Sequence, residues 1–238
     1  MMNKKIVALT LAAGLTSSVL LSSMSVFAAD SAVAPDPATA STPVTADLTI
    51  NQKPSNPAIP APSNPTTPTI PDKNNPGNVD ANPQGLYGIA YYPSAFNFSG
   101  ELNDNSTQQE FVATGSNQNK FNLGVKDKTR ENKGWDVKAQ LTGSVASIPG
   151  ASLNIAGNSS VKVNNSGTLE ADPTNAVTGA TNVTVNGTQN TVMTANDQYH
   201  NSTYDYSLGT VKLVITNPSQ VSAGNYTGNV VWTLTTAP

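Results

Sequence analysis

Residues 226–235 read YTGNVVWTLT, and this stretch decides the fold class. Successive side chains of a β-strand point to opposite faces. One face therefore collects the aromatic and aliphatic side chains, namely Tyr226, Val230, Trp232 and Leu234. The other face carries mostly threonine and asparagine. This alternation predicts a strand with one face in a hydrophobic core.

A second strand, residues 134–142 with the sequence GWDVKAQLT, follows the same design. Its apolar face holds Trp135, Val137, Ala139 and Leu141. Because each tryptophan shares its face with aliphatic residues, we interpret both as core residues, whose burial stabilises by roughly 3 kcal/mol or more. The alternative is that Trp135 and Trp232 stack on the sugar rings of a glycan.

The remaining sequence from Leu86 onward consists of short alternating segments separated by Gly, Asn, Asp and Pro. These breaks recur at roughly ten-residue intervals, and no window shows helical periodicity. The pattern predicts an all-β fold, a single two-sheet β-sandwich of Ig-like or jelly-roll-like type. A barrel is the alternative.

The first 28 residues have the organisation of a signal peptide. MMNKK forms a basic start, an apolar segment follows, and Val26-Phe27-Ala28 provides the small-residue spacing of a cleavage site. Cleavage is expected after Ala28, with Ala29 as the alternative, and no membrane span is expected once the signal is removed. The sequence therefore predicts a secreted protein.

Two further segments differ from the β domain, which is expected to cover residues 45–238. Residues 29–44 are small, polar and proline-containing, and are expected to be disordered. A short strand is predicted at 46–50. The segment 53–84 holds nine of the seventeen prolines, and it is expected to form an extended excursion after that strand.

Composition excludes several function classes. Charged residues make up 11% of the chain, and the net charge of -3 with no basic run argues against nucleic-acid binding. Cysteine is absent, so stability has to come from a core and not from disulfides. His200 is the single histidine, and no catalytic or metal-ligand motif surrounds it. We expect no enzyme activity, no cofactor and no metal, and interpret residues 103–105, Asn-Asp-Asn, as a turn and not a calcium loop.

The two tryptophan strands resemble those of the WxL surface-protein family of low-GC Gram-positive bacteria. The distal match comprises Ala223-Gly224-Asn225-Tyr226-Thr227, then Val230-Val231-Trp232-Thr233-Leu234. In the proximal motif Val137 stands where the family usually has leucine. The proline-rich excursion followed by a segment rich in Tyr and Phe also looks like this family, so the resemblance covers nearly the whole mature chain.

The resemblance implies non-covalent attachment to the cell wall at the cell surface, with peptidoglycan as the ligand. It also implies that other exported surface proteins of the same system are partners. The alternative is a subunit of a surface complex, or an adhesin, that is retained by protein–protein contacts. No anchor is expected after Pro238, since the sequence has no LPxTG-like pentapeptide, C-terminal hydrophobic span or lipobox cysteine.

Two groups of residues are candidates for the wall-binding surface. Residues 199–206, YHNSTYDY, combine aromatic and hydrogen-bonding side chains suited to a carbohydrate, namely Tyr199, His200, Tyr204 and Tyr206. The other exposed aromatic candidates are Tyr87, Tyr91 and Tyr92. The alternative for all of them is an ordinary cross-strand role. A basic group lies at Lys120, Lys126, Lys128, Arg130 and Lys133, where binding to wall carboxylates or phosphates competes with a solvated-loop interpretation.

Overall fold

The computed structural model describes residues 35–50, 77–81, 83–104, 108–114, 121–165 and 168–236, with only the backbone described at Ile50. The predicted signal peptide, most of the proline-rich segment, Asn105 and Lys120 lie outside the described residues. All described residues belong to one compact unit.

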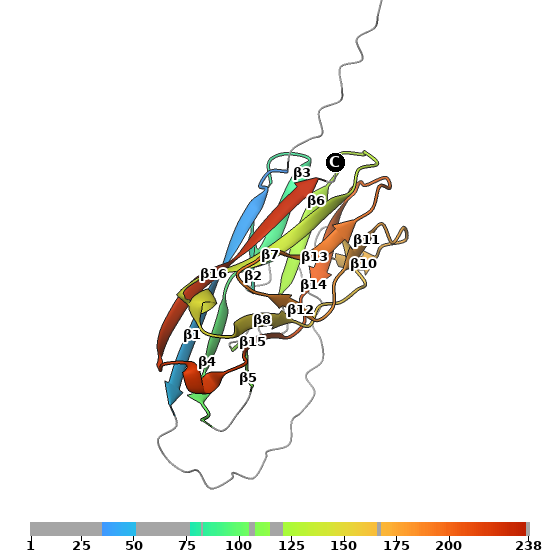
Figure 1. Ribbon diagram of the computed structural model, residues 1–238. Coiled ribbons are helices and arrows are strands. Elements are labelled where there is room, and N and C mark those ends of the chain that lie inside the picture. The colour runs from blue at the N-terminus through green and yellow to red at the C-terminus, as the bar shows by residue number, and fades with distance from the viewer. Residues whose placement is uncertain are drawn as a thin grey trace, which may run out of the picture. The chain divides into compact units, whose positions relative to one another are not determined.

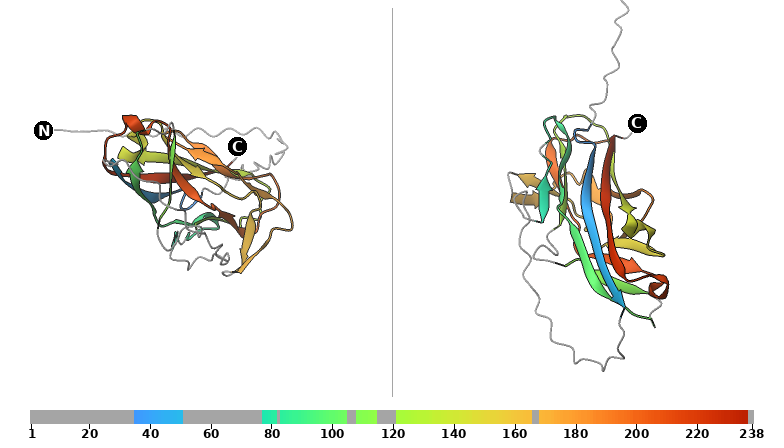
Figure 2. Two further views of the ribbon diagram at one scale, coloured as in Figure 1. Left: turned by 90° about the horizontal axis from the view of Figure 1, so that it is seen from below. Right: turned by 90° about the vertical axis from the view of Figure 1, so that its left-hand side faces the viewer.

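The first sheet, sheet A, contains both tryptophan strands. Its order is β11-β13-β7-β16-β1-β4, and only the β1–β4 pair is parallel. Figure 1 shows the long strand β16 between β1 and β7, and the right view of Figure 2 shows β4, β1 and β16 side by side. The bounds are β11 (Val177–Gly179), β13 (Asn190–Ala195), β7 (Trp135–Gly143), β16 (Gly224–Thr236), β1 (Thr39–Ile50) and β4 (Phe96–Leu102).

Two further sheets are antiparallel throughout. Sheet B consists, in order, of β10 (Thr168–Ala171), β9 (Lys162–Asn165), β14 (Ser202–Ser207), β6 (Asn122–Asp127), β3 (Tyr87–Pro93) and β2 (Asn78–Asp80). Sheet C consists of β12 (Val183–Val185), β8 (Ala151–Ile155), β15 (Val211–Ile215) and β5 (Gln109–Val112). Two short 3₁₀ turns, η1 (Ser144–Ser147) and η2 (Pro218–Gln220), complete the described elements.

Sheet A packs against both of the other sheets. Towards sheet B, the Trp135 ring lies 6.1 Å from the ring of Tyr204 on β14. Towards sheet C, the ring of Phe111 on β5 fills the space beside Gly100 on β4. The all-β sandwich expected from the sequence is confirmed, and hydrogen bonding divides the layer facing sheet A into two sheets.

The two tryptophan strands are direct neighbours. In the antiparallel β7–β16 pair, Leu234 lies opposite Val137, Trp232 opposite Ala139, and Thr236 opposite Trp135. The apolar faces predicted for both strands point into the core. Every residue predicted for those two faces, except Tyr226, is at most 1% exposed. Tyr226 is half-buried, and its hydroxyl donates to the Ser222 carbonyl at 2.7 Å.

Two boundary predictions are wrong. Residues 39–44 are the first half of β1 and not disordered, because they pair with β16 and bury alternate side chains such as Thr42 and Val44. The domain also begins before residue 45, since the Asp36 N–H donates to the Tyr87 carbonyl. At the other end of the proline-rich segment, residues 78–80 form β2 by pairing with β3.

A buried carboxylate lies between strands of sheet B. Asp205, 3% exposed, accepts from the Tyr91 hydroxyl at 2.6 Å and from the Asn122 amide at 2.8 Å. Burial raises the pKa of Asp205 to about 6, although both hydrogen bonds and the charge of Lys162 act to lower it. Removal from water therefore outweighs the hydrogen bonds in setting this pKa.

The raised pKa predicts that the protein becomes more stable as the pH falls. An unfolded aspartate titrates near 3.8, so between about pH 4 and 6 the folded state binds the extra proton. The stability contributed by Asp205 is complete below about pH 4 and is lost as the pH rises through about 6, a change of about 3 kcal/mol. Urea unfolding at pH 4.5 and pH 7.5 should show about 2 kcal/mol of this change, and Asp205→Asn, which cannot ionise, should show a smaller change. Equal changes in both proteins would contradict the assignment.

Candidate functional site

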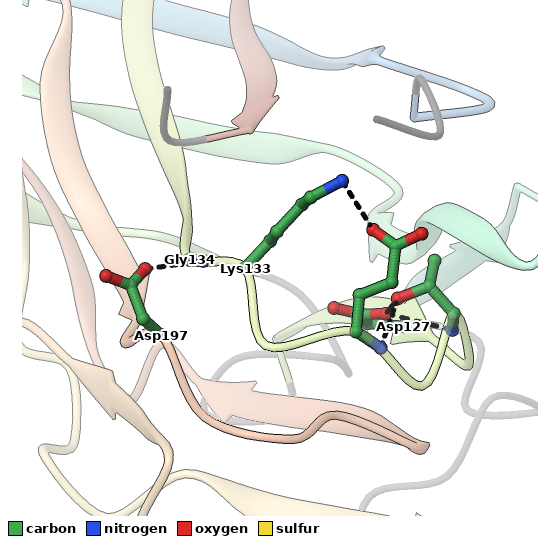
Figure 3. Close-up of polar contacts among 6 residues, drawn as sticks. Asp127, Lys133, Gly134 and Asp197 are labelled. Atoms are coloured by element: carbon green, nitrogen blue, oxygen red, sulfur yellow. Dashed lines mark hydrogen bonds and ion pairs between the residues drawn. The ribbon is translucent and has the colours of Figure 1, made fainter. Parts of the chain in front are cut away.

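The loop between β6 and β7, residues 128–134, leads directly into Trp135. It is held from two sides. The Lys128 N–H donates to the Leu86 carbonyl at 2.9 Å. On the other side, the Arg130 N–H donates to the His200 carbonyl, and the Gly134 N–H donates to Asp197 Oδ1 at 2.9 Å. Figure 3 shows Lys133 and Gly134 on this loop, Asp127 just before it, and Asp197 on the neighbouring segment that faces Gly134. The loop is therefore fixed by backbone contacts to two neighbouring segments.

Asp127, the last residue of β6, organises the inner side of the loop. Its Oδ1 accepts from the Thr129 hydroxyl at 2.7 Å and from the Thr129 N–H at 3.2 Å, which forms a tight turn. Its Oδ2 accepts from the Trp135 indole N–H at 3.0 Å. The single polar group of this buried indole is thereby satisfied, as a core tryptophan requires.

Aromatic rings of the 196–206 segment pack behind Trp135. The rings of His200 and Tyr204 lie 6.3 and 6.1 Å from that of Trp135, and they meet each other edge to face at 5.6 Å. His200 Nε2 lies 2.8 Å from the Asn196 carbonyl, which can only accept, so Nε2 carries the proton. Nδ1 then accepts from the Tyr204 hydroxyl at 3.2 Å. Burial raises the pKa of Tyr204 to about 12, which keeps this donor protonated.

Trp232 occupies a separate part of the core. Its indole N–H donates to the Thr42 hydroxyl at 2.7 Å, and that hydroxyl donates to the Pro93 carbonyl at 2.7 Å. All three positions are buried. The relay connects β16 through β1 to the end of β3, so this tryptophan joins sheet A to sheet B and has no access to a ligand.

A surface pocket lies at the outer edge of Trp135. Its cavity volume is about 10 Å³, which is room for about one water molecule. Its lining includes Glu131 and Lys133, whose side chains are 24% and 38% exposed. We call it the Trp135 pocket, and its principal lining residues are Tyr87, Asp127, Thr129, Glu131, Lys133 and Trp135.

One hydrogen-bond donor in the Trp135 pocket lacks an acceptor. The Tyr87 side chain is 2% exposed, and its hydroxyl has no hydrogen-bond partner among the described residues. Lys133 Nζ, by contrast, is paired with Glu131 Oε2 at 3.0 Å. Burial, followed by the charges of Asp127 and Asp136, raises the pKa of Tyr87 well above its usual value, so the hydroxyl stays protonated.

The structure corrects most of the predicted aromatic surface. The carbohydrate-contact prediction is wrong for His200, Tyr204 and Tyr206, which are at most 3% exposed and lie in the core. Tyr206 is bonded to the Ala180 carbonyl, away from Trp135. Tyr87 and Tyr91 are also buried, and Tyr92 is half-buried. Tyr199, 53% exposed, is the one residue of the predicted cluster that faces solvent.

The predicted basic group separates into different environments. Lys126 Nζ donates to the Pro83 carbonyl, and Lys133 pairs with Glu131. Lys128 and Arg130 are exposed on the loop. Leu86, 54% exposed, accepts a hydrogen bond from the Lys128 N–H through its carbonyl. On the other side of the loop, the His200 carbonyl accepts from the Arg130 N–H, and Tyr199 directly precedes His200. We refer to these four exposed residues, which lie on the loop or on the segments hydrogen-bonded to it, as the loop surface: Leu86, Lys128, Arg130 and Tyr199.

Sequence reasoning missed the Trp135 pocket. Its residues come from β3, the end of β6, the following loop, the start of β7 and the end of β16, so no spacing along the chain predicts it. Within the described part of the chain, no group of three or more His, Asp or Glu side chains could hold a metal ion. No helix in that part is long and apolar enough to cross a membrane.

Comparison with known proteins gives one result. A family model described as WxL domain surface cell wall-binding matches residues 36–238, nearly the whole of the described chain. No curated protein and no solved structure matches.

Proposed function

Because the chain belongs to the WxL domain surface cell wall-binding family, we propose that it is secreted and attaches non-covalently to the cell wall by binding peptidoglycan. The observation that carries the proposal is the family match across residues 36–238. The signal-peptide pattern of residues 1–28 supports export.

The proposed wall contact is the loop surface and not the motif tryptophans. Trp135 and Trp232 are at most 1% exposed and both indole N–H groups have acceptors inside the protein. The loop surface instead offers two cations on a loop held by backbone hydrogen bonds, and an aromatic ring and an aliphatic side chain on the segments bonded to that loop. Aromatic faces and positive charges suit the sugar rings and carboxylates of peptidoglycan.

We also propose that the domain binds its ligand without transforming it. Both ring nitrogens of the single histidine, His200, are engaged inside the core. The raised pKa of Asp205 belongs to a carboxylate enclosed by Tyr91 and Asn122. Neither group is available to a substrate in this structure.

Sedimentation with purified sacculi tests the proposal. The purified mature protein is expected to sediment with sacculi stripped of other polymers. The double variant Lys128→Ser/Tyr199→Ser should bind roughly tenfold more weakly, which corresponds to about 1.4 kcal/mol. The matched control is Val112→Ser/Lys212→Ser, which also removes one exposed apolar residue and one lysine, but on sheet C.

Two results would contradict the proposal. If the wild type does not sediment with bare sacculi but does sediment with cells that carry other exported surface proteins, the domain is retained as a subunit of a complex. If both double variants bind as the wild type does, the loop surface is not the contact.

A further inference from the structure

We propose that Arg130 is the specificity-determining contact of the loop surface and that its guanidinium binds a carboxylate of the peptidoglycan peptides. The inference deepens the proposed wall binding and rests on it for the source of the ligand. Arg130 is the single arginine among the 12 basic residues of the chain. Its backbone conformation, its exposure and the charges around it carry the proposal.

The backbone of Arg130 is left-handed, with a φ of 63°. This region is unfavourable for a residue with a Cβ, and glycine and asparagine tolerate it best. The other described non-glycine residues with a positive φ are both asparagines, Asn175 and Asn182. An arginine in this conformation is therefore unusual, and its presence calls for a reason outside local backbone preference.

The neighbouring segments hold Arg130 in this conformation. The Arg130 N–H donates to the His200 carbonyl at 3.1 Å, and the His200 N–H donates to the carbonyl of the next loop residue, Glu131, at 3.3 Å. On the other side, both the N–H and the hydroxyl of Thr129 donate to Asp127 Oδ1. The guanidinium is thus carried on a backbone that is fixed before a ligand arrives, which lowers the entropy lost on binding.

The charges around Arg130 favour an anionic ligand. Arg130 and Lys128 are both exposed, and neither forms an ion pair with a described residue. Of the two acidic residues in this stretch, Asp127 is buried and accepts hydrogen bonds within the protein, and Glu131 is paired with Lys133. The loop therefore presents two uncompensated positive charges to solvent.

The guanidinium group favours a planar anion with two oxygens. Its N–H groups form a rigid fork that donates two parallel hydrogen bonds to one carboxylate, whereas a lysine ammonium acts as a point charge. Peptide carboxylates are anions of peptidoglycan itself, while phosphates belong to polymers attached to it. Tyr199, on the segment bonded to Arg130, adds an exposed aromatic ring for the groups next to the carboxylate.

Sedimentation with chemically modified sacculi tests this contact. Sacculi stripped of other polymers are compared before and after their carboxylates are converted to amides. Arg130→Gly should bind the untreated sacculi about tenfold more weakly than the wild type does. Amidation should weaken the wild type by a similar factor and leave the variant unchanged, because the guanidinium and the carboxylate belong to one contact. Equal weakening of both proteins by amidation overturns the proposal.

Two further variants separate the fork from the charge. Arg130→Lys keeps the positive charge without the fork, so it should recover only part of the lost binding. Lys212→Ser removes a surface charge on sheet C and should bind as the wild type does. Full recovery by Arg130→Lys would overturn the role of the guanidinium.

Thermal unfolding shows that the loss of binding does not come from unfolding. Arg130→Gly replaces a strained residue with the one best suited to a positive φ, so its Tm should be unchanged or higher. Asn182→Gly is the matched control, since Asn182 also has a positive φ but lies in the turn before β12. It should keep its Tm or gain, and it should bind sacculi as the wild type does. Wild-type binding by Arg130→Gly overturns the proposal.

The single arginine also provides a direct probe in solution. Its Nε–H group gives one guanidinium signal in ¹H–¹⁵N NMR spectra. Disaccharide-peptides released from the stripped sacculi by a muramidase should shift that signal, and the same fragments with amidated carboxylates should not. Equal shifts with both, or no shift with either, overturn the carboxylate site. If amidation has no effect but sacculi that retain phosphate polymers bind the wild type more tightly than Arg130→Gly, the anion is a phosphate and the carboxylate assignment is overturned.

Failure of this inference can be told apart from failure of wall binding. If the wild type and Arg130→Gly sediment equally with untreated sacculi, the arginine site fails while wall binding stands. If the wild type does not sediment but the disaccharide-peptides shift the Arg130 signal, wall binding fails and the arginine site stands.

Discussion

Trp232→Ala is expected to cost about 4 kcal/mol or more of the free energy of unfolding. Trp232 is fully buried, and its removal leaves a large cavity in the longest strand of sheet A. The Thr42 hydroxyl also loses the indole donor that links it to β16. Because domains of this kind are stable by only about 5–15 kcal/mol, much of the variant should be unfolded in mild urea. Urea unfolding followed by circular dichroism measures the loss.

The matched control is Tyr199→Ala, which truncates an aromatic side chain that is 53% exposed. It should change the free energy of unfolding by no more than about 0.5 kcal/mol. A folded Trp232→Ala protein with nearly wild-type stability would show that the indole is not a core residue.

Gly228→Ala is expected to lower the free energy of unfolding by about 3 kcal/mol or more, the second largest effect after that of Trp232→Ala. A Cβ at Gly228 would lie 2.0 Å from the Thr142 carbonyl oxygen and 2.7 Å from Val145 Cγ1. The oxygen belongs to the backbone of β7, so relief requires movement of the strand pair that carries both tryptophans. The same unfolding experiment measures the effect.

Gly224→Ala is the control within the same strand, since nothing lies within 4 Å of a Cβ at that position. It should be neutral or slightly stabilising, because alanine has less freedom in the unfolded chain. If both alanine variants had the same stability, the close approach of β16 to β7 at Gly228 would be disproved.

The sequence correctly predicted those strands in which one face is buried and the other is exposed to solvent. Residues 135–141 and 230–234 alternate apolar and polar side chains, and their inward faces follow that period. The first half of β1 could not be found in this way. Its inward positions include Ala40 and Thr42, which are small or polar, and they are buried because β16 pairs with them.

The tyrosines of β14 were misplaced for a different reason. The prediction assumed that a run of aromatic and polar residues has an exposed face. In the structure Tyr204, Asp205 and Tyr206 are all buried, since the Asp205 side chain is covered by Tyr91 and Asn122. Partners far away in the sequence decide this burial, so local patterning carries no signal for it. The same holds for the pocket, which Tyr87 and Trp135 reach from different strands.

Quenching of tryptophan fluorescence by acrylamide tests most directly whether the motif tryptophans form the fold and leave wall binding to other residues. The chain has two tryptophans, 1% and 0% exposed, so the native protein should be quenched far less than free N-acetyltryptophanamide. Saturating amounts of sacculi should leave this low quenching unchanged. Native quenching close to that of the free compound, with protection on addition of sacculi, would contradict the account.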